Sequence, residues 1–330
     1  MTQFQLVAAC GILLLKGSVL LEAEARVPAT ALAFTADGNA LLVGGRCAVR
    51  LRSVPDGKLE RSFACAFPKI GAFAFSPDSR TLAVSGGTPG VSGGVEFFEW
   101  PTGNAAGCLT NHSDQATAVA FNPSATLLAS AGADGLVQLF NWPQKTPAYR
   151  LDGHSGPVLA VAFSPDSALL VTASADRSIK VWEAASGKLR RSFSQHTDIV
   201  HCLAYRPRTS GEGEPVPFDC ASGSQDGTVR IWQPAIGRMV RIVRGHEGPV
   251  FALAYSADGA RLYSAGKEGV VRVIDAGSDQ ILHSWRAHED WIYGLVVGCN
   301  DRVLATGDWT GTVKLWDVRG PIPRLLKVIR

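Results

Sequence analysis

The chain has 330 residues, of which 46% are hydrophobic and 18% charged, with a net charge of +3. This composition excludes a disordered chain, and the small net charge argues against nucleic acid or an anionic membrane surface as the main partner. No run reaches the ~18 apolar residues that a membrane helix needs. None of the seven cysteines forms a C-x-x-C pair, which gives no support for a zinc or redox motif and indicates a reducing, cytoplasmic compartment.

Residues 1–29 hold three short apolar runs, at 6–9, 12–15 and 19–24, with a turn at 16–18. Residues 7–10 look like a lipoprotein cleavage box, but no Lys or Arg precedes them and the upstream stretch is too short for a signal peptide. We therefore interpret this segment as hairpin strands that precede the first full repeat.

Residues 30–100 contain two sets of short strands separated by Pro, Asp and Gly turns. The first set covers 30–34, 40–44, 48–52 and 59–63. The second covers 71–75, 81–85 and 95–100, and a Gly-rich loop is predicted at 86–94.

From residue 112 a longer pattern recurs, most clearly at 153–182. It opens with Gly153-His154, continues through apolar runs at 158–163 and 169–174, turns at Asp176, and ends in a third run at Trp182. His112, His154 and His196 are spaced by 42 residues, and so are His246 and His288. The longer step from 196 to 246 reflects a polar insertion at 206–217. A fixed period of this size predicts a repeat architecture.

The pattern resembles the WD-repeat β-propeller family. The resemblance rests on Gly-His at 153–154 and 245–246, on Trp316-Asp317, and on the run that ends at Trp232. It implies an all-β propeller of four-stranded antiparallel blades that occupies residues 1–330 as one domain. We predict seven blades, with eight as the alternative if the N-terminal strands contribute one. Either 19–24 or 324–329 could supply the strand that closes the ring.

Within this family, a His, a Ser or Thr, an Asp and a Trp from each repeat form a hydrogen-bonded chain, because these four side chains satisfy one another when buried. The resemblance implies two full sets: His154, Thr172, Asp176, Trp182; and His196, Ser222, Asp226, Trp232. The third repeat has Phe140 at the Trp position. The sixth has Glu268 and Ile274, and the seventh has Thr310 at the Asp position. Repetition of the His–Asp pair favours structure over catalysis, since an enzyme needs one site.

Other motifs give little support for catalysis. Gly90, Ser92 and Gly94 match the G-x-S-x-G nucleophile elbow, which requires a strand-to-helix turn rather than a loop between strands. The predicted innermost strands carry almost no acid or base, with His201 as the exception. We therefore predict no catalytic residues, no metal site and no cofactor.

The face that carries the His loops and the Asp turns commonly binds partners in this family. The resemblance places two groups of residues there: Ala133, Ala175, Gln225, Lys267 and Trp309 from the turns; and Asp198, Asp290 and Trp291 from the loops. Because Trp is favoured at binding hot spots, Trp291 and Trp309 are the predicted anchors, although both could instead pack under neighbouring loops.

The predicted function is a non-enzymatic scaffold that binds a protein or peptide, as a monomer or within a hetero-complex. A propeller enzyme or small-ligand binder that uses a loop-face pocket is the alternative. A nucleic-acid or chromatin binder would need a continuous Lys/Arg stripe. The chain could also be the sensory portion of a larger signalling protein.

Overall fold

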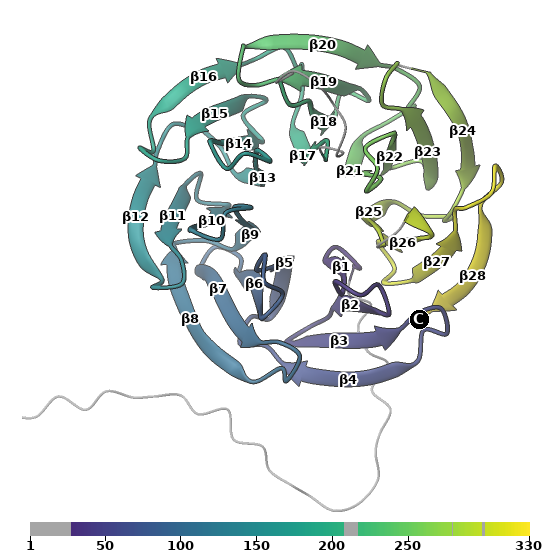
Figure 1. The fold of residues 1–330 in the computed structure, drawn as a ribbon, viewed down its shortest axis with the longest axis horizontal. Helices are drawn as coiled ribbons and strands as arrows, with labels where there is room; N and C mark the ends of the chain where they lie inside the picture. Colours follow the sequence, from purple (N-terminus) through teal and green to yellow (C-terminus); the bar gives the residue numbers. More distant parts are fainter. Residues whose placement is uncertain (1–27, 208–216, 279, 299–300) are drawn as a thin grey trace, which may run out of the picture.

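Seven four-stranded antiparallel sheets are arranged around a central axis in the computed structural model (Figure 1). The structure describes residues 28–207, 217–278, 280–298 and 301–330. The predicted all-β propeller and its seven blades are confirmed. The strands predicted at 6–24 lie outside the described residues.

Each blade is built from four consecutive strands, numbered in chain order and running from the axis outward. Blades 1 and 2 contain β1 Leu32–Phe34, β2 Ala40–Gly44, β3 Ala48–Ser53, β4 Leu59–Ala64, β5 Lys69–Phe75, β6 Thr81–Thr88, β7 Ser92–Glu99 and β8 Ala105–His112. Blades 3 and 4 contain β9 Ala116–Phe121, β10 Leu127–Gly132, β11 Val137–Asn141, β12 Thr146–Leu151, β13 Val158–Phe163, β14 Leu169–Ser174, β15 Ile179–Glu183 and β16 Leu189–Phe193.

Blades 5 to 7 follow the same plan. They contain β17 Val200–Tyr205, β18 Cys220–Ser224, β19 Val229–Gln233, β20 Arg238–Val243, β21 Val250–Tyr255, β22 Arg261–Gly266, β23 Val270–Asp275, β24 Ile281–Arg286, β25 Ile292–Val297, β26 Val303–Asp308, β27 Val313–Asp317 and β28 Arg324–Ile329.

The core lies between neighbouring sheets rather than within one sheet. The second strand of a blade is buried along its length, as in β14 and β18, whereas the outermost strands β4 and β28 are mostly exposed. One apolar cluster joins Val171 of blade 4 to Trp232 of blade 5. A single sheet therefore cannot bury its own apolar faces, and the blades stabilise one another.

Within the described residues, each sheet is built from consecutive strands of the chain, and no strand from one terminus joins the sheet of the other. Residues 324–329 form a strand as predicted, and among the strands that the structure describes β28 pairs with β27 alone and completes its own sheet. Blades 1 and 7 are joined by apolar packing of Leu32 and Leu41 against Ala305 and Leu315. In addition, the Ala29 N–H donates a hydrogen bond to the Asp308 carbonyl over 3.0 Å.

The Gly-rich loop predicted at 86–94 is wrong, because most of it is strand. β6 and β7 form one long hairpin in which Gly86 pairs with Gly94 and Thr88 with Ser92. A Cβ placed on Gly87 of β6 would lie 2.3 Å from the Ser92 carbonyl oxygen of β7, and one on Gly94 of β7 would lie 1.8 Å from the Leu109 carbonyl oxygen of β8, so only glycine lets these strands approach this closely. Ser92 therefore starts a strand in a hairpin, not a helix, and the nucleophile-elbow geometry is absent from it.

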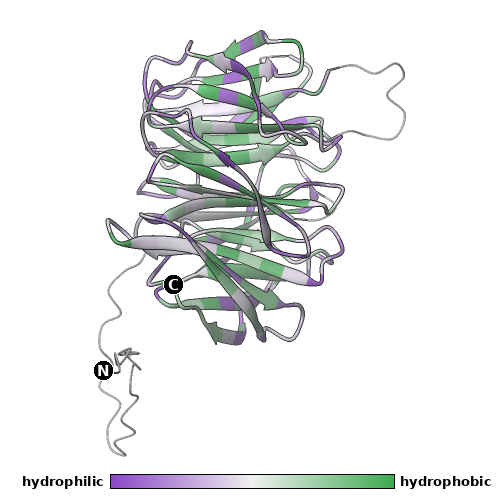
Figure 2. Cartoon of the chain, turned by 90° about the vertical axis from the view of Figure 1, so that its left-hand side faces the viewer, coloured by the Kyte–Doolittle hydropathy of each residue, from purple (hydrophilic) through white to green (hydrophobic). Residues whose placement is uncertain are grey.

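The ring has two faces, visible edge-on in Figure 2, where hydrophilic segments gather in the connections on both sides. Because the strands within a blade alternate in direction, one face carries the connections between blades and the turns between second and third strands. We call this the loop face. The turns that join first to second and third to fourth strands lie on the opposite face.

Candidate binding surface on the loop face

Three blades contain a complete four-residue hydrogen-bonded chain, which we call a tetrad. In blade 4, His154 Nδ1 lies 2.9 Å from Asp176 Oδ2 and its Nε2 lies 2.7 Å from Thr172 Oγ1. The Trp182 indole N–H donates to the same Thr172 oxygen over 3.0 Å. Blade 5 repeats this arrangement with His196, Ser222, Asp226 and Trp232 at distances of 2.8 Å.

These contacts fit a neutral imidazole that carries its proton on Nδ1. The hydroxyl accepts from the indole and donates to Nε2, and the ring then donates from Nδ1 to the carboxylate. Burial lowers the pKa of His154 although Asp176 acts in the opposite direction. Burial would raise the pKa of Asp176, but hydrogen bonds from Ser178 and His154 outweigh it and lower the pKa to about 2. Each acid is therefore fully used within its own blade.

The acid of blade 7 is Asp308, not Thr310. His288 Nδ1 lies 2.7 Å from Asp308 Oδ2, and Thr306 and Trp316 complete a full tetrad. Repeat spacing pointed to Thr310 because the acid in the other blades follows the hydroxyl residue by four positions. Asp308 follows Thr306 by two. In blade 3 the residue at that position is Gly132, and a Cβ built on it would lie 2.4 Å from His112 Nδ1. A side chain at this position is therefore aimed at the histidine.

Two blades replace a missing member of the tetrad. Blade 3 has Phe140, which offers no N–H, and Asn111 Nδ2 instead donates to Ser130 Oγ over 2.7 Å. Blade 6 has Glu268 as the acid, 2.9 Å from His246 Nδ1, and Arg272 binds both oxygens of that carboxylate at 3.0 and 2.7 Å.

The tetrads also hold the loops that precede the innermost strands. The Asp176 carboxylate accepts a hydrogen bond from the Ser155 backbone N–H over 3.0 Å, and Asp226 accepts one from Thr197 over 3.1 Å. Each tetrad thus ties the loop that enters a blade to the turn between its second and third strands. The loop face is stiff as a result.

Four aromatic side chains of blades 6 and 7 form a continuous surface at the loop-face end of the innermost strands. We call Phe251, Trp291, Tyr293 and Trp309 the aromatic cluster. Phe251 and Tyr293 stack with ring centroids 4.6 Å apart, and Trp309 lies 5.6 Å from Tyr293 and 6.4 Å from Trp291. Trp291 and Trp309 remain 40% and 53% exposed, so the two tryptophans predicted as anchors lie together and face solvent.

Phe251 and Tyr293 were missed by the sequence analysis, although a signal for them exists. Each is the extra residue of a β-bulge at the start of an innermost strand, since Val250 pairs with Gly266 but Ala252 with Ala265, and blade 7 repeats this. His201 occupies the same position in blade 5. A bulge re-aims a side chain out of the ladder. The signal is an aromatic or His residue five positions after the tetrad histidine in three successive repeats.

The other predicted surface residues surround this cluster. His201 packs edge-on against Phe251 at 4.9 Å and hydrogen-bonds Gln225 Oε1 over 2.9 Å. Lys267 places its Nζ 5.6 Å from the Trp291 ring centroid. The Asp198 and Asp290 carboxylates each accept a hydrogen bond from the next residue's backbone N–H. Ala133 and Ala175 are half-buried in the turns of blades 3 and 4, away from the aromatic cluster.

Comparisons with known proteins agree with this architecture. Residues 157–302 match the family model described as the fourth β-propeller of WDR90, and residues 103–141 match the WD domain, G-beta repeat. The chain belongs to the WD-repeat β-propeller family. It is similar to the WD repeat-containing protein 55 homologs of Drosophila ananassae, 39% identical over 66 residues, and Drosophila persimilis, 39% identical over 70 residues. These segments cover 20% and 21% of this chain and 14% of each relative.

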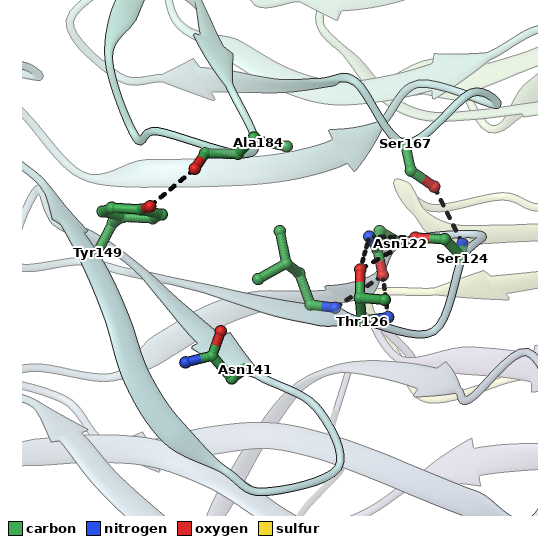
Figure 3. Close-up of a pocket in the computed structure, with 9 residues that line it drawn as sticks. Asn122, Ser124, Thr126, Asn141, Tyr149, Ser167 and Ala184 are labelled. Atoms are coloured by element: carbon green, nitrogen blue, oxygen red, sulfur yellow. Dashed lines mark hydrogen bonds between the residues drawn. The ribbon is translucent and has the colours of Figure 1, made fainter.

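This WD-repeat propeller also has a cavity of about 300 Å³ between blades 3 and 4 (Figure 3). One side is lined by Asn122, Ser124 and Thr126. Ser124 contacts the next blade, because its backbone N–H donates a hydrogen bond to Ser167 Oγ over 3.0 Å. Tyr149 lines the other side and donates its hydroxyl to the Ala185 carbonyl over 2.7 Å. The turns that form the cavity lie opposite the loop face, and its lining contains no charged side chain.

Among the described residues, no group of three or more His, Cys, Asp or Glu side chains is arranged to hold a metal ion. The same part of the chain contains no helix with the length and apolar character needed to span a membrane. The acids and histidines of the WD-repeat propeller that are buried together are those of the tetrads, and each is already engaged by its neighbours.

His246 of blade 6, which contacts Glu268 and Ser264, makes stability depend on pH. Burial, together with the positive charge of Arg272, lowers the pKa of His246 to about 4. In the unfolded chain this histidine has a pKa near 6.5, so it binds a proton at pH values where the folded protein does not. The free energy of unfolding therefore falls as the pH drops from about 6.5 toward 4.

We expect the protonation of this one histidine in the unfolded chain to lower the free energy of unfolding by about 2 kcal/mol between neutral pH and about pH 5. Urea unfolding of the wild type and of His246→Gln at both pH values measures it, because the other histidines cancel in the difference. The stability advantage of the wild type should shrink by that amount in acid. An advantage that stays constant would contradict the prediction.

Proposed function

We propose that this chain is a non-enzymatic scaffold that binds a peptide segment of a protein partner through the aromatic cluster on its loop face. The observation that carries the proposal is the contact between Trp291 and Trp309, which remain half exposed over Phe251 and Tyr293. Large aromatic side chains gathered on a soluble surface mark interaction sites, and Trp is the most favoured hot-spot residue.

The rigidity of the surface supports the proposal. Trp309 follows Asp308 directly, and its backbone N–H donates to the Trp291 carbonyl over 2.9 Å. The blade 7 tetrad therefore fixes both anchors before a partner arrives. A surface held in its bound arrangement loses little conformational entropy on binding. WD-repeat propellers generally act as protein-interaction modules, and the relatives found here carry WD repeats in their names.

A non-enzymatic role and a cytoplasmic location are part of the same proposal. Each tetrad acid hydrogen-bonds to the histidine of its own blade. These pairs are therefore already engaged in structural contacts and do not form a separate acid–base pair for catalysis among the described residues. The described cysteines are unpaired, and burial raises the pKa of Cys202 to about 12, so this thiol is unreactive. Such cysteines suit a reducing compartment.

The test is peptide binding by the wild type and by a Trp291→Ala/Trp309→Ala variant. Peptides selected from a displayed random library on the wild type should lose at least ~100-fold in affinity for the variant, since each anchor is expected to contribute about 2 kcal/mol or more. Fluorescence titration of synthetic versions measures this loss.

The matched control replaces two exposed apolar residues away from the loop face, Leu59→Ala/Ile236→Ala, which are 53% and 52% exposed. This variant should bind as the wild type does. Melting curves of all three proteins establish that they are folded. Equal affinity of the selected peptides for the wild type and the tryptophan variant would refute the proposed surface.

A further inference from the structure

Resting on this proposed function, we infer that the aromatic cluster receives a cationic side chain, Arg or Lys, of the partner peptide. We further infer that Lys267 occupies this place in the free protein and must leave it when the peptide binds. Two independent features carry the inference: an internal ammonium over the ring of an anchor, and carboxylates on both sides of the cluster.

The first feature is the position of Lys267. Its Nζ lies 5.6 Å from the Trp291 ring centroid, and its stem runs along Gly248, where an added Cβ would lie 3.4 Å from Lys267 Cδ. No hydrogen bond or ion pair to this ammonium is present within the described parts of the chain. A cation is attracted to the face of Trp more strongly than to the other aromatic rings. The Trp291 face therefore already binds a cation, and it is one that the protein supplies itself.

The second feature is the pair of carboxylates that flank the cluster. Asp290 of blade 7 and Asp198 of blade 5 each use Oδ1 to accept the N–H of the next residue, at 2.7 and 2.8 Å. Their Oδ2 atoms accept no hydrogen bond from the residues that the structure describes. The negative charge of Asp290 acts on Tyr293, whose pKa is raised by burial and then by this carboxylate. Burial lowers the pKa of His201 and Asp198 acts against it, so that carboxylate lies near the other edge.

The remaining charges around the cluster do not offset these carboxylates. Glu247, which is exposed on the loop of blade 6, adds a third acid. Arg286 pairs with Glu289 at 3.8 Å, and Arg272 is engaged by Glu268, so neither is a free cation. Lys267 is thus the cation that contacts a ring of the aromatic cluster, and it lies among the acids Asp198, Glu247 and Asp290. An acidic side chain would meet repulsion here, whereas a cation gains both the ring face and the carboxylates.

The experiment uses four synthetic peptides of one Gly/Ser sequence that differ only in a central Arg, Lys, Met or Glu. Binding to the full chain is followed by tryptophan fluorescence and by the displacement of NMR signals from the cluster. We expect the Arg and Lys peptides to bind, more weakly as salt is added, and the Glu peptide to bind least.

Two variants test the roles of the charges. Lys267→Met keeps the apolar stem but removes the competing ammonium, so the Arg and Lys peptides should bind about 3- to 10-fold more tightly. Asp290→Asn keeps the shape and the hydrogen bond to Trp291 N–H, and should weaken the same peptides by about 3- to 10-fold. The Met peptide should change little with either variant.

The outcomes separate this inference from the proposed function. If the Met or Glu peptide binds best, or if Lys267→Met weakens the Arg peptide, the cationic occupant is wrong, while peptide binding at the cluster still stands. If none of these peptides binds and library-selected peptides are also insensitive to Trp291→Ala/Trp309→Ala, both fail together. Library-selected peptides that need the tryptophans but lack Arg and Lys would overturn the inference alone.

Discussion

Replacement of Trp232 by Ala is expected to lower the free energy of unfolding by about 3–5 kcal/mol. The indole is 1% exposed and packs against Phe193 with ring centroids 5.0 Å apart, in the cluster that joins blades 4 and 5. Its N–H also donates to Ser222 Oγ over 2.8 Å. The substitution therefore leaves a cavity between two blades and removes a buried donor at the same time. Urea unfolding followed by circular dichroism measures the loss.

Conservative variants separate packing from hydrogen bonding. Trp232→Phe keeps a ring and loses the donor, so it should cost only about 1–2 kcal/mol. Blade 3 already has Phe140 at this place and obtains its donor from Asn111, the residue before the tetrad histidine. Gln195 precedes His196, so Gln195→Asn combined with Trp232→Phe should recover part of that smaller loss. A Trp232→Ala variant as stable as the wild type would refute the role of the indole.

Replacement of Asp308 by Ala is expected to cost about 2–3 kcal/mol, because several donors lose one buried acceptor. The carboxylate accepts from His288 Nδ1 at 2.7 Å and from the backbone N–H groups of Thr310 and Thr312 at 2.8 and 3.0 Å. The Ala29 N–H also donates to the Asp308 carbonyl, so blade 7 meets blade 1 at this residue. Chemical denaturation near neutral pH measures the effect.

Thr310→Ala is the matched control, because repeat spacing assigns the acid position of blade 7 to Thr310. Its hydroxyl donates only to Asp308 Oδ1 and contacts Thr312, so its removal should cost less than about 1 kcal/mol. If Thr310→Ala proves as damaging as Asp308→Ala, the assignment of the acid to Asp308 is wrong. Thr310→Ala should also bind peptides normally, because its side chain lies outside the aromatic cluster, whereas Asp308→Ala should weaken peptide binding because it removes the tetrad acid that supports Trp291 and Trp309.

The repeat pattern predicted the architecture because it is a local property that recurs. Turn residues such as Asp176 and strand residues such as Trp182 lie close together in the chain, and their period requires neighbouring sheets to cover one another. The pairing of Trp291 with Trp309 on one face was also predictable, since both flank tetrad positions of the same repeat. Their contribution to binding stays a prediction.

Two local features needed the tertiary structure. The bulges that turn Phe251 and Tyr293 toward the tryptophans depend on pairing across strands, and their side chains come together only because blades 6 and 7 are adjacent. A Gly-rich composition by itself favours a loop or turn, which is why a loop is predicted within 81–99. The structure has a hairpin there instead, because the glycines let neighbouring strands approach closely.

The sequence by itself determined the order of the sheets and favoured seven of them over eight, because each repeat encodes its own turns and strands within about 40 residues. Tertiary structure alone decided how the ring closes and which acid serves blade 7. Closure places Ala29 against Asp308, and the carboxylate of Asp308 reaches His288 across two strands, so both depend on distances that no spacing along the chain records.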